Sequence, residues 1–164
     1  MIDRALCIVA ILLLGGCAGH VTESPHIAAA TSAQAGRYAI MFAGCNDCHT
    51  PGWSRTAGAI PDAKWMTGTD IGYHGPWGTV YPKNVRLMAS SMSRAGWIAL
   101  FQAGPPVPVM PFWNYSHGRI DDRDLGAMYD FLKSLGPAGK DAPDDLSPSQ
   151  KPHTKILVFS PVKP

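Results

Sequence analysis

The pattern of apolar positions along the chain predicts three main helices. In each, large apolar residues recur at helical spacing, a Ser, Thr or Asp stands where it can cap the first turn, and a glycine follows the end. In the last of them, apolar residues fall at i, i+3, i+4 and i+7 from Leu125. The predicted helices are one capped by Thr31 or Ser32 that runs to Gly44, then Arg94–Ala103 after Ser93, and Asp122–Leu135 after Asp121.

Between these helices the chain is rich in turn-forming residues, with 17 Gly and 15 Pro in all. Residues 50–92 show no sustained periodicity, which predicts a loop with brief helical turns, and residues 105–120 read as a proline-rich loop. After Lys140 the chain is too rich in proline for a helix, although Ile156–Phe159 would pack back as an extended strap. The predicted fold class is therefore all-α, with long loops joining the helices.

The first residues predict export. An apolar stretch, residues 8–14, follows Arg4; it is shorter than the roughly 20 residues that span a bilayer and is typical of a secretory signal. It ends in Leu14-Gly15-Gly16-Cys17, which looks like a lipobox, so Cys17 would become the lipidated mature N-terminus. The alternative is an ordinary signal peptide cut near Ala28–Ala30.

Four segments follow from this interpretation: a signal peptide (1–16), a flexible membrane leash (17–30), one domain (31–137) and a proline-rich C-terminal extension (138–164). Several acyl chains on Cys17 would hold the protein stably at a membrane, so the predicted location is the periplasm, membrane-anchored. The charges are nearly balanced, with 14 basic and 12 acidic residues, and no basic run points to nucleic acid.

The strongest chemical signal is Cys45-Asn46-Asp47-Cys48-His49, because C-x-x-C-H is the attachment pattern of one covalent c-type haem. On a helical turn, positions i, i+3 and i+4 share a face. Cys45 and Cys48 would form the thioether bonds, and His49 would ligate the iron. The competing readings are a zinc half-site, which lacks a second ligand pair, and a thioredoxin-like redox pair, which lacks its βαβ context.

The other two of the four cysteines are Cys7 and Cys17. If Cys7 is removed with the signal peptide and Cys17 is lipidated, only the haem pair remains. A structural disulfide is then impossible.

The sixth iron ligand separates a carrier from a catalyst. A Met thioether opposite His raises the potential and closes the coordination sphere, and Met110 is the candidate because it lies in a loop between Pro108 and Pro111. The alternative is that Met110 fills a packing gap, with His74 or His117 as substitute ligands. The methionines not preferred are Met88 and Met92, close to the second helix, and Met128, on the core face of the last.

Two stretches carry a family resemblance. Gly36-Arg37-Tyr38 ahead of Gly44–Pro51, and Met110-Pro111 ahead of a last helix ending in Lys133–Leu135, resemble single-haem class I cytochromes c of the bacterial periplasm. The resemblance covers residues 32–137. It implies an all-α, cytochrome c-like fold wrapped around one covalent haem, in which the first and last helices cross with Gly36 against Phe131. Residues 75–87 are similar to a subgroup associated with periplasmic dehydrogenases.

The resemblance also implies an acceptor for the His49 imidazole, because Pro61, 12 residues further on, matches a proline whose carbonyl has that part in the family; Pro51 is the alternative. The haem propionates need donors, and one segment offers several, while Trp65 would close the pocket. The aromatic members of this set would otherwise be ordinary core residues. The candidate donors are Trp77, Tyr81, Asn84 and Arg86.

These features predict an electron carrier that performs no substrate chemistry. It would accept electrons from a periplasmic dehydrogenase or membrane complex and pass them to an oxidase or another cytochrome. Two alternatives remain: a ligand-binding or peroxidase-like haem protein with an open sixth site, and a fixed cytochrome subunit of a dehydrogenase.

Overall fold

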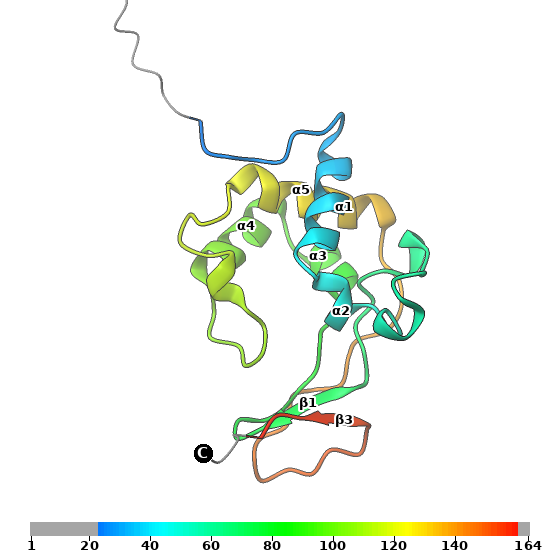
Figure 1. Ribbon diagram of the computed structural model, residues 1–164. Coiled ribbons are helices and arrows are strands. Elements are labelled where there is room, and N and C mark those ends of the chain that lie inside the picture. Colours follow the sequence, from blue (N-terminus) through cyan, green and yellow to red (C-terminus); the bar gives the residue numbers. More distant parts are fainter. Residues whose placement is uncertain (1–22, 161–164) are drawn as a thin grey trace, which may run out of the picture.

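The computed structural model describes residues 23–160 (Figure 1). Within this part of the chain, five α-helices lie above a small sheet of three strands, and three single 3₁₀ turns punctuate the loops. The helices are α1 (Ser32–Phe42), α2 (Cys45–His49), α3 (Val85–Ser91), α4 (Arg94–Ala103) and α5 (Asp122–Leu135). The strands are β1 (Gly72–Gly75), β2 (Gly78–Val80) and β3 (Ile156–Val158), and the 3₁₀ turns are Ser54–Thr56, Asp62–Lys64 and Phe112–Asn114.

The three predicted helices are present as α1, α4 and α5, and their caps are confirmed. The side chain of Thr31 accepts from the backbone N–H of Gln34, that of Ser93 from Gly96, and that of Asp121 from Arg123. Each cap satisfies one of the backbone donors that a helix start leaves unpaired. The first helix ends at Phe42, two residues before Gly44.

Helices α1 and α5 cross in direct backbone contact, in the arrangement that the resemblance implied (Figure 1). A Cβ atom on Gly36 would lie 1.8 Å from the carbonyl oxygen of Ala127, so only a glycine lets the two helices approach this closely. The neighbour of Gly36 is thus the backbone of Ala127. The ring of Phe131 packs instead against Trp65, with 6.0 Å between ring centroids.

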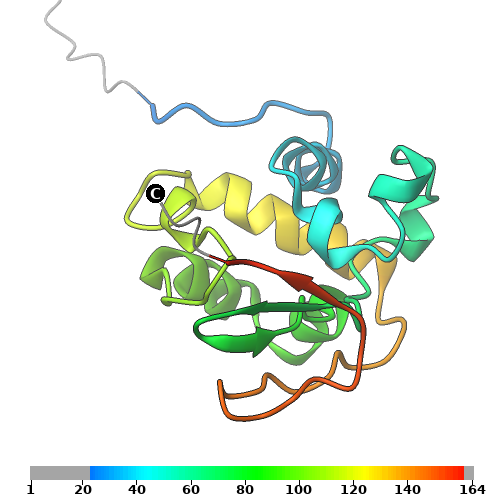
Figure 2. The same cartoon turned by 60° about the horizontal axis from the view of Figure 1, so that its bottom comes forward.

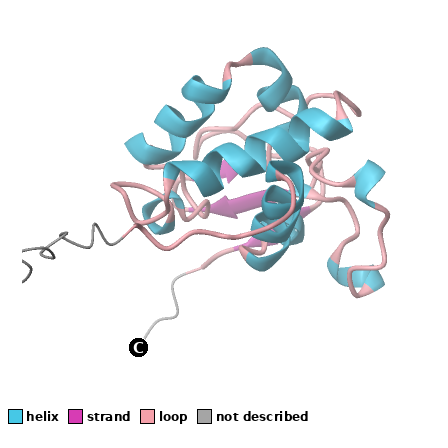
Figure 3. Cartoon of the chain, turned by 90° about the horizontal axis from the view of Figure 1, so that it is seen from above, coloured by secondary structure: helices cyan, strands magenta, loops and turns pink. Residues whose placement is uncertain are grey.

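The prediction of an all-α, cytochrome c-like fold with three main helices is wrong. Strands β1 and β2 form an antiparallel hairpin in which Gly75 pairs with Gly78, and β3 adds to β1 in parallel, giving the order β2-β1-β3. Figure 3, seen from above, shows the strands lying beneath the helices. Strands of three or four residues are too short for an alternating pattern to register, and β3 comes from a distant part of the chain.

The prediction of a long loop over residues 50–92 is correspondingly incomplete, because this stretch also forms α3. The side chain of Asn84 caps α3 by accepting from the backbone N–H groups of Arg86 and Leu87. With seven residues, α3 is too short to show a helical period in the sequence. The two brief turns at Ser54–Thr56 and Asp62–Lys64 are of the kind that was expected.

The expectation of a C-terminal strap is confirmed by β3. The extension runs beneath the hairpin and returns along β1, as Figure 2 shows. On the way, Leu146 forms an antiparallel bridge with Thr79. Gly78 makes room for this bridge, since its φ is +100° and a Cβ there would lie 2.0 Å from the carbonyl oxygen of Leu146.

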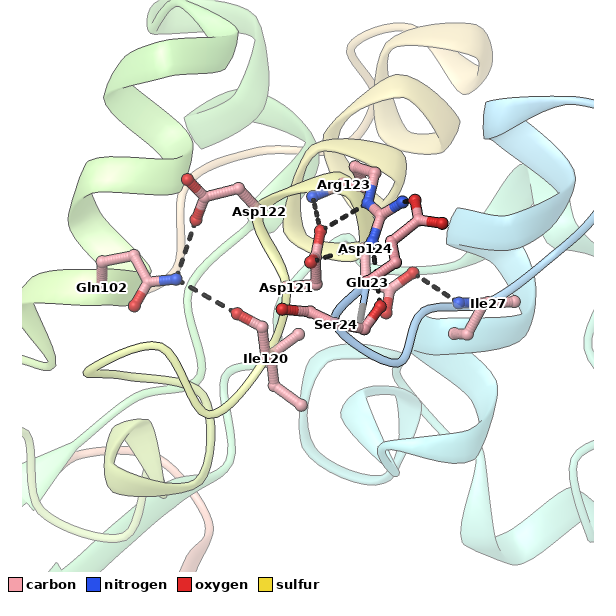
Figure 4. Close-up of polar contacts among 9 residues, drawn as sticks. All are labelled: Glu23, Ser24, Ile27, Gln102, Ile120, Asp121, Asp122, Arg123 and Asp124. Atoms are coloured by element: carbon pink, nitrogen blue, oxygen red, sulfur yellow. Dashed lines mark hydrogen bonds and ion pairs between the residues drawn. The ribbon is translucent and has the colours of Figure 1, made fainter. Parts of the chain in front are cut away.

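The described part of the predicted leash, residues 23–30, contacts the start of α5 (Figure 4). The guanidinium of Arg123 bonds to Glu23, to the backbone oxygen of Ser24 and to Asp121, while Asp124 accepts from the backbone N–H of Ile27 at 2.9 Å. The predicted signal peptide (1–16) and Cys17 lie outside the described residues. Over residues 23–160, no helix has the length and apolar character needed to cross a membrane.

The Arg123 contacts predict a specific acid sensitivity. The guanidinium of Arg123 bonds to Asp121 and lowers the pKa of that carboxyl to about 2, against about 3.9 in an unfolded chain. The charged cap therefore stabilises the fold above about pH 4 and is lost as the pH falls towards 2. We expect Asp121→Asn to lower the free energy of unfolding at pH 7, with the difference from the unmodified protein shrinking towards pH 2. Urea titrations at several pH values measure this, with Asp141→Asn as an exposed control; a difference independent of pH would contradict it.

Candidate functional site

A cavity of about 520 Å³ lies between the helices and the hairpin. Its size falls within the roughly 300–1,000 Å³ typical of small-molecule and cofactor sites. The wall is built from the end of α1, from α2, α3, α4 and α5, from the hairpin and residues 81–83 after it, and from the loop of residues 105–111. The large apolar side chains on it are Ile40, Val85, Trp97, Leu100, Phe101, Phe112 and Leu132.

The five-residue motif occupies α2, which begins directly after α1. The backbone at Gly44 is left-handed, with φ +70°, so the chain changes direction between α1 and α2 at this residue. Cys45, Cys48 and His49 all reach the cavity wall, as the i, i+3, i+4 spacing predicted. The motif is therefore carried to the cavity by the α1–α5 crossing and one left-handed residue.

Both cysteines are free and partly buried. Burial raises the pKa of the Cys45 thiol to about 12, so at neutral pH this sulfur is a thiol. A thioredoxin-like site needs the opposite, a cysteine whose pKa is lowered so that a thiolate attacks. The environment of Cys45 therefore does not suit a dithiol redox pair.

His49 has a fixed orientation. Its Nδ1 lies 2.8 Å from the backbone oxygen of Lys83, and a proton on Nδ1 leaves Nε2 free to act as a ligand. Burial lowers the pKa of the imidazole, which favours the neutral form that a metal requires. The acceptor is thus the backbone carbonyl of Lys83. The resemblance had implied the carbonyl of Pro61, with that of Pro51 as the alternative, and neither is the acceptor. The carbonyl of Pro61 instead accepts from the backbone N–H of Lys64 at 2.8 Å.

Met110 lies on the cavity wall in the loop before the 3₁₀ turn at Phe112–Asn114. Its neighbour Val109 has φ +70°, a left-handed conformation that is strained for a β-branched residue. Strain of this kind accumulates at functional sites, where the surrounding structure holds it.

Met110 is one of several methionines around the cavity. Met66, Met88 and Met128 also line it, whereas Met92 does not. The two substitute histidines lie elsewhere: His74 bonds through Nδ1 to the hydroxyl of Thr79, and His117 is exposed. Of the side chains that the sequence analysis weighed for the sixth position, only methionines therefore line this cavity.

Of the residues predicted to meet the propionates, Tyr81 lies on the wall, and its hydroxyl is 2.9 Å from that of Thr154. Trp77 packs on Phe159 outside the cavity, and Asn84 caps α3. Arg86 is buried and donates to backbone oxygens at the end of α5 and in the 3₁₀ turn Asp62–Lys64. The acceptors of its guanidinium are Ala63, Leu135 and Gly136.

Trp65 does not line the cavity. Its indole N–H donates to the backbone oxygen of Ile60 at 2.8 Å, and its ring stands edge-on to Trp53, with the guanidinium of Arg37 over it at 4.8 Å. For Trp65 the alternative of an ordinary core aromatic residue is the one that fits.

Several polar residues of the wall were missed from the sequence: Tyr73, Lys83, Tyr115 and Asp145. Burial, and after it the nearby Cys48 and Cys45, raise the pKa of Tyr73 and of Tyr115, respectively. Lys83 lies between the predicted donors Tyr81 and Asn84 but was not among them. Asp145 gave no local signal, because it comes from the C-terminal extension.

Comparison with known proteins leaves the interpretation to the site itself. No protein-family model matches this chain, and neither does a curated protein or a solved structure. Among residues 23–160, no group of three or more His, Cys, Asp and Glu side chains gathers in a way that would hold a metal ion.

The contacts of Arg86 predict a structural role. Arg86→Met would leave three backbone oxygens without their charged donor, at a cost on the order of 3 kcal/mol in the free energy of unfolding. The content and the absorption spectrum of the predicted haem should stay unchanged. Unfolding in guanidinium chloride, followed by circular dichroism, measures the loss of unfolding free energy. Arg55→Met, at an exposed arginine, is the control. A variant of normal stability with an altered cofactor spectrum would show that Arg86 reaches the cofactor instead.

Proposed function

We propose that this chain is a c-type cytochrome: it binds one haem covalently and carries single electrons without substrate chemistry. One observation carries the proposal. Two thiols and an oriented imidazole, spaced as C-x-x-C-H, open together onto an apolar cavity of about 520 Å³.

The residues present fit a haem. Cys45 and Cys48 would bond to it, His49 would supply one axial ligand through Nε2, and Met110 the other. Each of these four side chains lies on the cavity wall. The remaining wall is mainly aliphatic and aromatic, which suits a flat apolar macrocycle.

The iron of a bound haem supplies reversible exchange between the ferrous and ferric states. The chain's own residues prepare the site for it. The Lys83 carbonyl holds the His49 imidazole in one tautomer and makes its Nε2 a better donor. The aromatic and aliphatic side chains of the wall offer apolar surface to the macrocycle, while the Lys83 ammonium bonds to Asp145 at 2.7 Å.

Methionine as second axial ligand supports a carrier over a ligand-binding or peroxidase-like protein. A thioether in the sixth position closes the coordination sphere and raises the potential. Four methionines line the cavity, and His74 and His117 do not. Met110 is the proposed ligand among the four because the strained residue Val109 and the surrounding prolines fix its loop.

The proposal extends to location and partners. The signal-like start and Cys17 favour a protein that lies in the periplasm and is tethered there by lipid. The periplasm would also be the compartment in which haem is attached. Its partners would be redox proteins: a dehydrogenase as donor, and an oxidase or another cytochrome as acceptor.

Covalent attachment is the direct test. Expressed together with a haem-attachment system, the chain should retain haem through acidic acetone extraction and gain the mass of one haem. Cys45→Ser and Cys48→Ser should each lose one thioether, and the double variant should retain no covalent haem. Met92→Leu, off the cavity wall, serves as control. Haem that extracts freely from the unmodified protein would refute the proposal.

The distal ligand is tested separately. Met110→Ala should open the sixth position, lower the midpoint potential and allow carbon monoxide to bind the ferrous haem. Met66→Leu, Met88→Leu and Met128→Leu remove the other thioethers of the wall and should leave the ferric spectrum near that of the unmodified protein. If the Met110→Ala protein does not bind carbon monoxide and one of the three control variants does, the methionine replaced in that control is the ligand.

A further inference from the structure

The C-terminal extension grips the segment Thr79–Asn84 from outside. Thr79 exchanges two backbone hydrogen bonds with Leu146, at 2.9 and 2.8 Å, and the hydroxyl of Tyr81 meets that of Thr154. At the far end, the amide of Asn84 donates to the backbone oxygens of Ala138 and Lys140. The segment is therefore bound at both ends and at Tyr81 by residues more than fifty positions further on.

Asp145 is at the centre of this contact. One of its carboxylate oxygens accepts both from the backbone N–H of Tyr81, at 3.0 Å, and from the ammonium of Lys83, at 2.7 Å. Hydrogen bonds to a carboxylate are among the stronger ones in proteins. Asp145 also reaches the cavity wall, so it links the extension directly to the site.

The other side of the same segment faces His49. The Lys83 carbonyl is the acceptor for Nδ1. The backbone on either side of Lys83 bonds to other parts of the molecule: the carbonyl of Pro82 accepts from the N–H of Thr69, and the N–H of Val85 donates to the carbonyl of Met66. Lys83 thus connects two groups through one residue. Its carbonyl meets the imidazole, and its ammonium meets Asp145.

We propose that Asp145 is a positioning residue for the proximal histidine. By fixing Tyr81 and Lys83 it holds the Lys83 carbonyl against His49, and so sets the orientation and electron donation of the imidazole. This inference rests on the proposed function. A firm hydrogen bond to Nδ1–H makes the imidazole more basic and favours the ferric state, so loosening the bond should raise the midpoint potential.

The test uses the ferrous holoprotein with labelled histidine. Asp145→Ala removes both hydrogen bonds, whereas Asp145→Asn removes the charge and keeps an oxygen for Tyr81; Asp144→Ala deletes a neighbouring carboxylate as control. Solvent exchange of the His49 Nδ1–H, followed by nuclear magnetic resonance, should be at least tenfold faster in Asp145→Ala. It should stay within about threefold of the unmodified protein in the other two. The potential should rise most in Asp145→Ala.

An equal rise of the potential in Asp145→Ala and Asp145→Asn, with unchanged exchange in both, would mean that only charge matters and would overturn the proposal. If Asp145→Ala yields no holoprotein, the unmodified protein gives the answer. There, the Nδ1–H should exchange with the same opening free energy as the amides of Tyr81 and Leu146. Greater protection of the Nδ1–H than of those amides would show that the extension opens without disturbing His49.

These outcomes are distinct from failure of the proposed function. A chain that takes up no covalent haem would refute the cytochrome proposal itself. Unchanged exchange in haem-loaded Asp145→Ala would remove only the role assigned to Asp145.

Discussion

The close crossing of α1 and α5 is the constraint on which the site depends. With no side chain at Gly36, the two helix backbones touch, and this fixes where α1 ends. Because α2 begins only three residues after Phe42, the same contact fixes the two cysteines and His49. Met128 and Leu132 of α5 also line the cavity. The α1–α5 crossing therefore positions both the motif and this part of the wall.

The site joins elements of very different origin. The motif comes from a short helix, while the contact that orients its imidazole comes from a loop residue, Lys83, and the support of that residue from an extension without regular structure around Asp145. Apolar residues of α4 and α5 complete the wall, and the indole of Trp97 ties these two helices together by donating to the Leu125 carbonyl. Two hydrogen bonds, both through Lys83, therefore connect the extension to the imidazole.

How far the sequence predicts this structure depends on how local each feature is. Helices α4 and α5 were predicted to the residue, because periodicity and caps such as Ser93 and Asp121 are properties of neighbouring positions. The motif was found for the same reason. The hairpin was missed because its strands have three or four residues, and the acceptor for His49 was misassigned because a backbone carbonyl leaves no trace in the identity of its residue.

The parallel pairing of β1 with β3 has a consequence for the order of folding. Gly72 pairs with Ile156, about half the chain away, so this contact closes a long loop, as the α1–α5 crossing also does. Such loops are entropically costly to close early and tend to form late. Each helix, whose internal contacts are local, can form first, while the hairpin still lacks its third strand and Lys83 its partner in the extension. The cavity would thus remain accessible beside the hairpin until the C-terminal extension has packed against it. This delay leaves time for a large ligand to enter.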